Sequence, residues 1–274
     1  MQFWDYIILL PLGLMAGASG GLLGIGGSVV MIPAMVILFG PDRQHLYQAT
    51  AMIVNFFVVA PAVMRHIMLR ATLRPVTRWM IPGAIVGAVA GVCLSELPIF
   101  VGPGQGYLQI AFAVFLGYVV LQNMWRLRTS AKLPYLSEAD SAKLSKPLIL
   151  TIVGLPTGML GGLLGVGGGL YAVPAQQVCL RIPLPNAIAN SSATILWSSV
   201  VGAVLKNASL SSHGHSWSQA ILMSICLIPT AMIGSWYSAA KVHQWPVKVI
   251  HVAFVLLLLY GGTRLFLVGW DQVS

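Results

Sequence analysis

The 274-residue sequence is poor in charge. Only 8% of its residues are Asp, Glu, Lys or Arg, whereas 57% are hydrophobic. A soluble domain carries about 25% charged residues, so this chain has too little polar surface to coat a globule in water. The composition excludes an ordinary soluble enzyme and a disordered protein. It predicts a polytopic membrane protein, with the lipid bilayer as its surroundings.

Acidic residues are few, and none lies in the middle of an apolar segment. Carboxylates inside a span mark proton relays and cation sites. Their absence argues against a carboxylate-gated cation pump and against an intramembrane aspartyl protease. The six acidic residues are Asp5, Asp42, Glu96, Glu138, Asp140 and Asp271.

Cysteine is scarce as well. Cys93, Cys179 and Cys226 are far apart and form no CxxC pair, so they indicate no metal framework. We expect them to be small buried hydrophobes. His213 and His215 could form a surface pair, but two ligands are too few for a metal centre. The sequence also lacks a nucleophile–base pair at membrane depth. We therefore expect no catalytic residue, no metal and no cofactor.

The apolar segments form two groups, separated by the polar stretch 126–146. We expect a first membrane repeat over 1–125, a cytoplasmic linker over 126–146 and a second membrane repeat over 147–274. The segments are 6–23, 28–39, 46–64, 77–95 and 107–125, then 147–164, 169–180, 187–205, 219–240 and 248–268.

The two halves repeat each other in sequence. Residues 13–33 read GLMAGASGGLLGIGGSVVMIP, and residues 154–174 read GLPTGMLGGLLGVGGGLYAVP. At a fixed offset of 141 positions most of the glycines, Leu22, Leu23 and Pro33 find identical partners. Chance does not produce such agreement at one offset, so the sequence indicates an internal duplication.

Basic residues are distributed unevenly between matching loops. Loop 65–78 holds four arginines, whereas its counterpart 206–218 holds only Lys206. Because cytoplasmic loops carry the excess of Lys and Arg, the repeats are predicted to have opposite orientations, with both termini outside. The net charge of +9 then belongs to cytoplasmic loops and does not indicate nucleic-acid binding. Lys206, at the outer end of a span, is expected to snorkel to the surface, although it could instead attract anions.

Each repeat begins with a Gly-rich element, 6–39 or 147–180, that must enter and leave the membrane on one side. Its second limb is about 18 Å long at 1.5 Å per residue, short of the ~30 Å hydrocarbon core. We expect a helix, a glycine break and a returning half-helix; two full spans remain the alternative. The fold class is then an all-α polytopic membrane protein of two inverted repeats, each a Gly-broken helix hairpin plus three transmembrane helices.

The glycine breaks are the predicted binding site. Broken backbone inside lipid must face protein or a wet cavity. A helix that restarts there offers free N–H groups and a positive dipole end, so two restarts facing one centre make an anion site without a basic side chain. The candidates are break glycines, hydroxyls and further polar side chains: Gly24, Gly26, Gly27, Ser28, Thr50, Gly165, Gly167, Gly168, Gly169, Ser191, Ser192, Asn55, Asn190, Gln176 and Tyr171.

The glycines also allow two other interpretations. Glycines in membrane helices often serve close helix packing, as in GxxxG. A phosphate-binding GxGxxG loop is disfavoured, because neither a βαβ unit nor a Walker lysine accompanies the glycines.

At the elements GGLLGIGGSVVMIP and GGLLGVGGGLYAVP the sequence resembles the TauE/SafE family, the sulfite exporter or 4-toluene sulfonate uptake permease group. The stretches PGAIVGAVAG at 82–91 and PTAMIGSWYSA at 229–239 match that family's second recurring feature. The resemblance implies a bacterial inner-membrane transporter with two inverted halves. It also implies sulfite, sulfoacetate or another organosulfonate as substrate, with export as the frequent direction.

We therefore expect a secondary transporter that moves a small sulfur-containing anion by alternating access around a midplane site. The residues by themselves indicate only a small anion. A passive anion channel and a carboxylate transporter stay open as alternatives, and so do a coupling proton or ion and a homodimer. A membrane enzyme lacks the necessary residues, and an accessory subunit gives no reason for a duplicated helix break.

Overall fold

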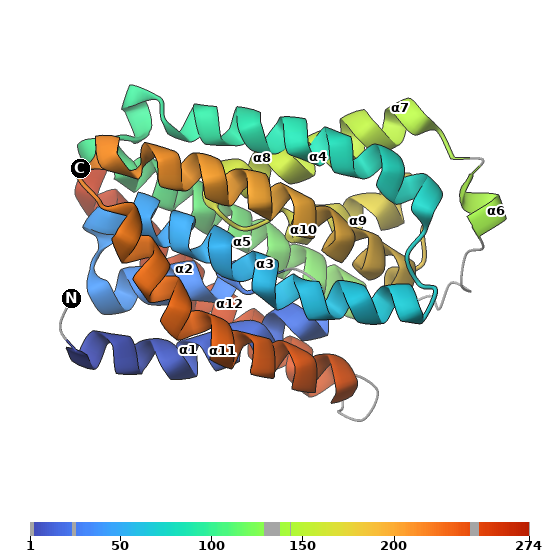
Figure 1. Cartoon of the computed structure of the whole chain (residues 1–274), viewed down its shortest axis with the longest axis horizontal. Coiled ribbons are helices and arrows are strands. Elements are labelled where there is room, and N and C mark those ends of the chain that lie inside the picture. Colours follow the sequence, from blue (N-terminus) through green and yellow to red (C-terminus); the bar gives the residue numbers. More distant parts are fainter. Residues whose placement is uncertain (1–2, 24–25, 129–137, 143, 242–246, 274) are drawn as a thin grey trace.

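The computed structural model describes residues 3–23, 26–128, 138–142, 144–241 and 247–273. Every regular element in these ranges is a helix, and six of the helical stretches are long and apolar enough to cross a bilayer. The chain is thus an all-α polytopic membrane protein. Figure 1 shows both termini at one end of the bundle, here called the terminal end, and α6 at the opposite end, here called the linker end.

The helices agree with the predicted apolar segments. The first half contains α1 (Phe3–Leu23), α2 (Ser28–Phe39), η1 (Pro41–Arg43), α3 (Gln44–Met68), α4 (Arg74–Ser95), η2 (Pro98–Phe100), η3 (Gly102–Gly104) and α5 (Gln105–Arg128). The second contains α6 (Glu138–Ser141), α7 (Lys146–Leu148), the π-helical η4 (Ile149–Gly154), α8 (Leu155–Leu164), α9 (Gly169–Cys179), α10 (Leu184–Ser209), η5 (Leu210–His213), α11 (Trp217–Lys241) and α12 (Val247–Val273).

The limbs of the two Gly-rich elements differ in length. Helices α2 and α9 have 12 and 11 residues, which correspond to about 18 Å and 17 Å, so neither can cross the ~30 Å hydrocarbon core. The preceding limbs are longer: α1 has 21 residues, and Lys146–Leu164 has 19. A long limb followed by a half-length limb is the geometry that a re-entrant hairpin requires.

The long helices pack in pairs that combine the two halves. Helix α1 packs along α11, and α8 packs along α4; α3 packs on α10, and α5 packs on α12. Each half-helix also contacts the long helix that follows it, α2 on α3 and α9 on α10. A duplicated chain with a two-fold relation would produce these exchanged pairings. The inversion of the repeats itself stays a prediction.

Glycines at four-residue spacing let two of these pairs approach closely. A Cβ at Gly17 would overlap the backbone of Ala231 on α11, and a Cβ at Gly158 would overlap the backbone of Ala84 on α4. The close-packing interpretation therefore holds for these stripes, and a Cβ at Gly168 in the second break would likewise overlap the backbone of Thr157. The stripes consist of Gly13, Gly17 and Gly21 in one half and Gly154, Gly158 and Gly162 in the other.

The expectation that the cysteines are buried is wrong. Cys93 and Cys179 are exposed, and Cys226 is half-buried. The surface of a membrane protein faces hydrocarbon, so a small hydrophobic side chain can lie there without the cost that it has in water.

The role of the glycine stripes in helix packing can be tested by measuring stability. Gly158→Ala should lower the stability of the purified protein by at least about 1 kcal/mol, because the added methyl overpacks the α4–α8 contact. The measurement is thermal unfolding in detergent. Gly117→Ala on α5 is the matched control, since its Cβ would meet nothing within 4 Å. Equal melting temperatures of the two variants would contradict the packing role.

Candidate functional site

The first helix break is closed by one side chain of α3. Gly26 has φ +82°, a left-handed conformation that suits glycine. Asn55 Oδ1 accepts hydrogen bonds from the amides of Gly27 at 3.0 Å and Ser28 at 3.1 Å, and its Nδ2 donates to Ser28 Oγ at 2.9 Å. The first amides of α2, which we expected to be free, are therefore capped. Gly24 lies outside the described residues.

The second break lies against the same asparagine. Gly165, Gly167 and Gly168 all have positive φ, between +70° and +79°. A Cβ at Gly167 would lie 3.2 Å from Asn55 Nδ2 and 2.9 Å from Ile195 Cγ2 on α10. The breaks of both halves thus meet at Asn55, whose side chain is fully buried.

The N-terminus of α9 differs from that of α2. Among the described residues, no side chain accepts a hydrogen bond from the amides of Gly169 and Leu170. The hydroxyls of Ser191 and Ser192 are fully buried and have no hydrogen-bond partner in the described part of the chain. They precede Ile195 by four and three positions, so they share the face of α10 that meets the second break. This side of the centre offers donors to a polar ligand.

Two predicted residues are engaged elsewhere. Thr50 Oγ1 donates to the carbonyl of Leu46 on its own helix, at 2.9 Å. Tyr171 Oη donates to the carbonyl of Ile152 at 2.9 Å. A regular helix would satisfy that carbonyl from residue 156, but Pro156 has no N–H. The hydroxyls of both residues therefore bond to carbonyls outside the breaks, although the amide of Tyr171 donates to the carbonyl of Gly168.

Asn190 and Gln176 form a separate group. Asn190 Nδ2 donates to Gln176 Oε1 at 3.0 Å, and Asn190 Oδ1 accepts from the amide of Leu73 at 2.8 Å. Gln176 also donates to the carbonyl of Ala187 at 3.2 Å. These bonds connect α9, α10 and the loop before α4, so they hold the half-helix in place.

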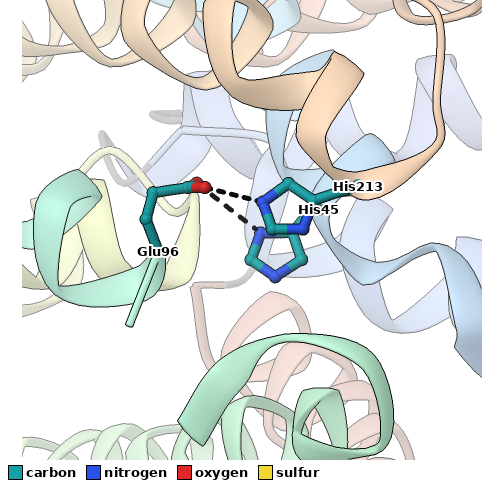
Figure 2. A group of neighbouring side chains, drawn as sticks. All are labelled: His45, Glu96 and His213. Carbon is teal, nitrogen blue, oxygen red and sulfur yellow. Dashed lines mark hydrogen bonds and ion pairs between the residues drawn. The ribbon is translucent and has the colours of Figure 1, made fainter. Parts of the chain in front are cut away.

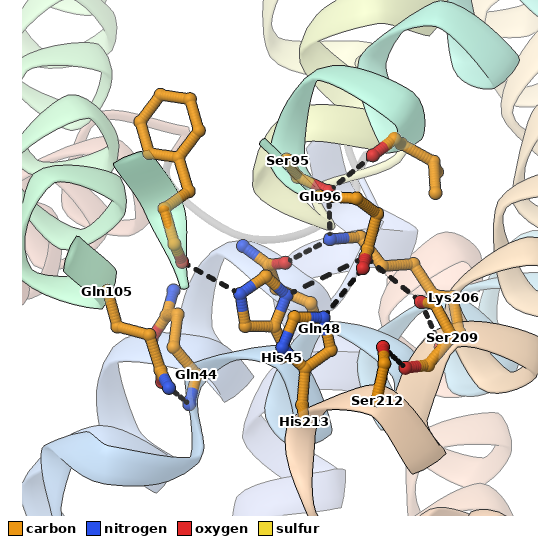
Figure 3. A network of polar contacts seen from close by, with 12 residues as sticks. Gln44, His45, Gln48, Ser95, Glu96, Gln105, Lys206, Ser209, Ser212 and His213 are labelled. Carbon is orange, nitrogen blue, oxygen red and sulfur yellow. Dashed lines mark hydrogen bonds and ion pairs between the residues drawn. The ribbon is translucent and has the colours of Figure 1, made fainter. Parts of the chain in front are cut away.

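Lys206 departs from its predicted role. It is 1% exposed, so the expectation that it snorkels is wrong. Its ammonium donates to Gln48 Oε1 at 2.7 Å and to Ser95 Oγ at 2.6 Å, as Figure 3 shows. Gln48 Nε2 in turn donates to the carbonyl of Leu163 at 3.2 Å, next to the second break. A buried cation is thereby joined to the break through one amide side chain.

Three further ionisable side chains gather at the terminal end, where α3 begins and α4 and α10 end. Figure 2 shows the carboxylate of Glu96 pointing at the rings of His45 and His213. The rings are stacked, with centroids 3.8 Å apart and planes 7° apart. His213 Nε2 lies 2.7 Å from Glu96 Oε2, and His45 Nδ1 lies 4.0 Å from Glu96 Oε1. We call these residues the histidine–glutamate cluster.

The carboxyl of Glu96 is held in its charged form. Its partial burial opposes ionisation, but hydrogen bonds from His213 and Ser209, with the positive charge of Lys206 nearby, outweigh that effect and lower its pKa. The Ser209 Oγ–Glu96 Oε1 distance is 2.9 Å. The cluster therefore contains a fixed negative charge beside two imidazoles.

Sequence reasoning missed Gln48 and the histidine–glutamate cluster, and it did not foresee that Lys206 is buried. It weighed His213 with His215 because they are close in sequence, whereas its spatial partners come from two other elements. One signal was present: Gln48 is a strongly polar residue inside the apolar segment 46–64, and Lys206 directly follows the apolar segment 187–205.

Comparison with known proteins identifies the family. The sequence matches the Sulfite exporter TauE/SafE family over residues 9–265, which is nearly the whole chain. The chain belongs to the TauE/SafE family. It is therefore a multi-pass membrane protein of a transporter family.

Three relatives of this TauE/SafE chain are named as probable membrane transporter proteins. It is 28% identical to MamO of Paramagnetospirillum magneticum over 90% of its own length, but it spans only 42% of that relative. It is 25% identical to YunE of Bacillus subtilis, with 97% and 98% of the two chains covered. It is 23% identical to MJ0441 of Methanocaldococcus jannaschii, with 96% and 97% covered. No solved structure matches the chain.

The capping role of Asn55 can be tested in the same way. Asn55→Ala should leave the amides of Gly27 and Ser28 buried without an acceptor, at a cost of about 1–3 kcal/mol for each. Asn55→Asp retains the acceptor and should recover part of that stability. Thermal unfolding compares the variants. Asn207→Ala is the control, because its amide bonds only the carbonyl of Ala203 on its own helix. If alanine and aspartate at position 55 melted alike, Asn55 would not act as the cap.

Proposed function

We propose that this TauE/SafE protein is a secondary transporter that exports a small sulfur-containing anion, such as sulfite or an organosulfonate, across the bacterial inner membrane. The observation that carries the proposal is the meeting of two helix breaks at Asn55, inside the bundle. Broken helices of this kind form the binding sites of many transporters. The sulfur chemistry rests on the family alone.

The polar groups around the centre favour an anion over a cation. The amides of Gly169 and Leu170 and the hydroxyls of Ser191 and Ser192 can donate hydrogen bonds. All six acidic residues of the sequence lie outside both breaks. A half-helix N-terminus adds a positive dipole end, which stabilises negative charge.

Lys206 extends this positive environment towards the terminal end. It occupies the same face of α10 as Ile195, three turns further along, since the two positions differ by eleven residues. Between them, Gly202 on α10 meets Met52 on α3. We propose that an anion moving between the breaks and the terminal end passes Gln48 and Lys206, and that the ammonium compensates its charge.

Alternating access supplies the mechanism in this proposal. The α3–α10 contact joins the two halves, and each half carries its own broken hairpin. Rocking of one half against the other would expose the centre first at the linker end and then at the terminal end. The linker end carries the arginine-rich loop 65–78, so we assign it to the cytoplasm.

Transport by the purified protein tests this function. Proteoliposomes should accumulate sulfite or sulfoacetate against its gradient when a proton or ion gradient is imposed. Dissipation of a substrate gradient without any uphill accumulation would favour the anion channel. Preference for acetate would favour the carboxylate transporter, and no transport of any anion would overturn the proposal.

The unpartnered hydroxyls allow the site itself to be tested. Ser191→Ala/Ser192→Ala should weaken anion binding about tenfold, because each lost hydrogen bond is worth about 0.5–1.5 kcal/mol. The fold should be unharmed, since neither hydroxyl has a protein partner. Binding is measured by the anion-induced rise in melting temperature. Ser199→Ala is the control, because its hydroxyl bonds the carbonyl of Ile195. Unchanged binding in the double variant would exclude these serines from the site.

The role of Lys206 in anion transport can be tested by substitution. Lys206→Met should reduce the apparent affinity for the transported anion by about 10–100-fold, the value of a hydrogen bond to a charged group. Initial rates of uptake at several substrate concentrations measure it. Arg264→Gln, which removes an exposed cation from α12, should transport normally. Equal affinities of Lys206→Met and the parent protein would show that the anion does not meet Lys206.

A further inference from the structure

We propose that His45, Glu96 and His213 form a binding site for a divalent transition-metal ion of the Zn²⁺ class at the terminal end of the bundle. The sequence predicted no metal site, because it offered only two histidines near each other. The proposal goes beyond anion transport and does not depend on which anion is carried.

The ligand set and its spacing fit such an ion. One ligand atom from each of the three residues can be chosen so that all lie within 4.8 Å of one another. Zn²⁺ bonds to imidazole nitrogen and carboxylate oxygen at about 2.0–2.2 Å, so tetrahedral ligand atoms lie about 3.4 Å apart. The 4.0 Å between His45 Nδ1 and Glu96 Oε1 needs only a small contraction. Two histidines and a carboxylate are an established donor set for zinc.

The hydrogen bond on the far side of the His45 ring decides which nitrogen is free. His45 Nε2 lies 3.1 Å from the carbonyl of Phe100. A carbonyl can only accept, so this nitrogen carries the hydrogen and Nδ1 presents its lone pair. A metal-binding histidine characteristically donates its other N–H to a backbone carbonyl or carboxylate. The ring is thus oriented in the manner of a metal ligand.

That free lone pair faces another acceptor. His45 Nδ1 is buried and has no hydrogen-bond partner, although a carboxylate oxygen of Glu96 lies 4.0 Å away. His213 Nδ1 is likewise buried without a partner. The side chains of His45 and His213 are only 1% and 2% exposed. The Glu96 side chain is 25% exposed, but its carboxylate oxygen and the buried lone pair of His45 Nδ1 repel each other unless a cation lies between them, and the geometry points to a metal ion in that position.

Among the described residues, two features oppose the site: the hydrogen bond between His213 Nε2 and Glu96 Oε2, whose proton a metal ion would have to replace, and the nearby Lys206. The charge of Lys206 interacts with both His45 and Glu96. Its hydrogen bonds, however, go to Gln48 and Ser95, so the ammonium does not occupy the position between the ligands. Removing this positive charge should therefore strengthen metal binding.

A bound ion would join three elements that are distant in sequence. His45 lies in the first turn of α3, Glu96 directly follows α4, and His213 ends η5 after α10. These elements come from both halves, so a metal ion bound here would cross-link the two halves at the terminal end.

Direct titration tests the site. The full chain, purified without a histidine tag and stripped with a chelator, is titrated with Zn²⁺ by calorimetry and with Co²⁺ by its visible absorption. We expect one ion per chain, with Co²⁺ in a low-coordinate environment of nitrogen and oxygen ligands. His45→Gln, Glu96→Gln and His213→Gln should each weaken binding by at least about 100-fold, because each removes a direct ligand. Mg²⁺, which prefers oxygen ligands, should give no heat.

Matched controls separate this site from adventitious binding. His215→Gln removes a histidine two positions from His213 and should bind Zn²⁺ like the parent chain. Lys206→Met should bind Zn²⁺ several-fold more tightly, although it should transport the anion less well. Because Lys206→Met is expected to strengthen metal binding and to weaken transport, the two measurements distinguish a failure of this proposal from a failure of the transport proposal.

Two results would overturn the metal site. One is Zn²⁺ binding by the parent chain no tighter than by the His45→Gln/His213→Gln double variant. The other is equal binding by the double variant and by His215→Gln. Melting curves without metal check that each variant is folded.

Discussion

A helix interrupted inside a bilayer must find partners for its backbone within the protein, because hydrocarbon offers none. This requirement organises the centre of the molecule. Asn55 meets it at the first break by capping α2, and the second break lies directly against the same side chain. One asparagine thus joins the two halves of the chain at the point where both lose their helical hydrogen bonds. The close glycine contacts of α1 with α11 and of α8 with α4 hold the breaks around it.

The two breaks are not equivalent, although their sequences are duplicated. The first is capped by Asn55, whereas the second lies against Ile195, whose helix face also carries Ser191 and Ser192; the hydroxyls of these serines have no partner among the described residues. At an offset of 141 the counterpart of Asn55 is Leu196, so the duplication did not preserve the cap. The centre is therefore asymmetric although the sequence is duplicated.

Polar groups outside the breaks lead from the centre to the terminal end. Gln48 connects the carbonyl of Leu163 with the ammonium of Lys206, and Lys206 lies beside the histidine–glutamate cluster. A buried cation is costly unless hydrogen bonds and a nearby negative charge compensate it. Here Gln48 and Ser95 supply the hydrogen bonds, and Glu96 supplies the charge. A negatively charged substrate would stabilise the positive charge of Lys206, whereas a metal cation bound to Glu96 would destabilise it.

The sequence alone determined the membrane class, the approximate positions of the helices and the family, because these depend on local hydropathy, glycine spacing and a motif present twice. Several helices extend beyond the apolar segments by three to five residues, as α3 (Gln44–Met68) extends beyond 46–64. It also pointed to the breaks, since consecutive glycines have few other uses inside lipid. Only the tertiary structure decided which side chains meet them. The side chain of Asn55 bonds to the first break, whereas the hydroxyls of Thr50 and Tyr171 donate to carbonyls elsewhere. Lys206 is buried. His213 stacks on His45 and lies beside Glu96, rather than pairing with His215. These outcomes depend on how α3, α4 and α10 pack, and packing between distant segments leaves no periodic trace in a single sequence.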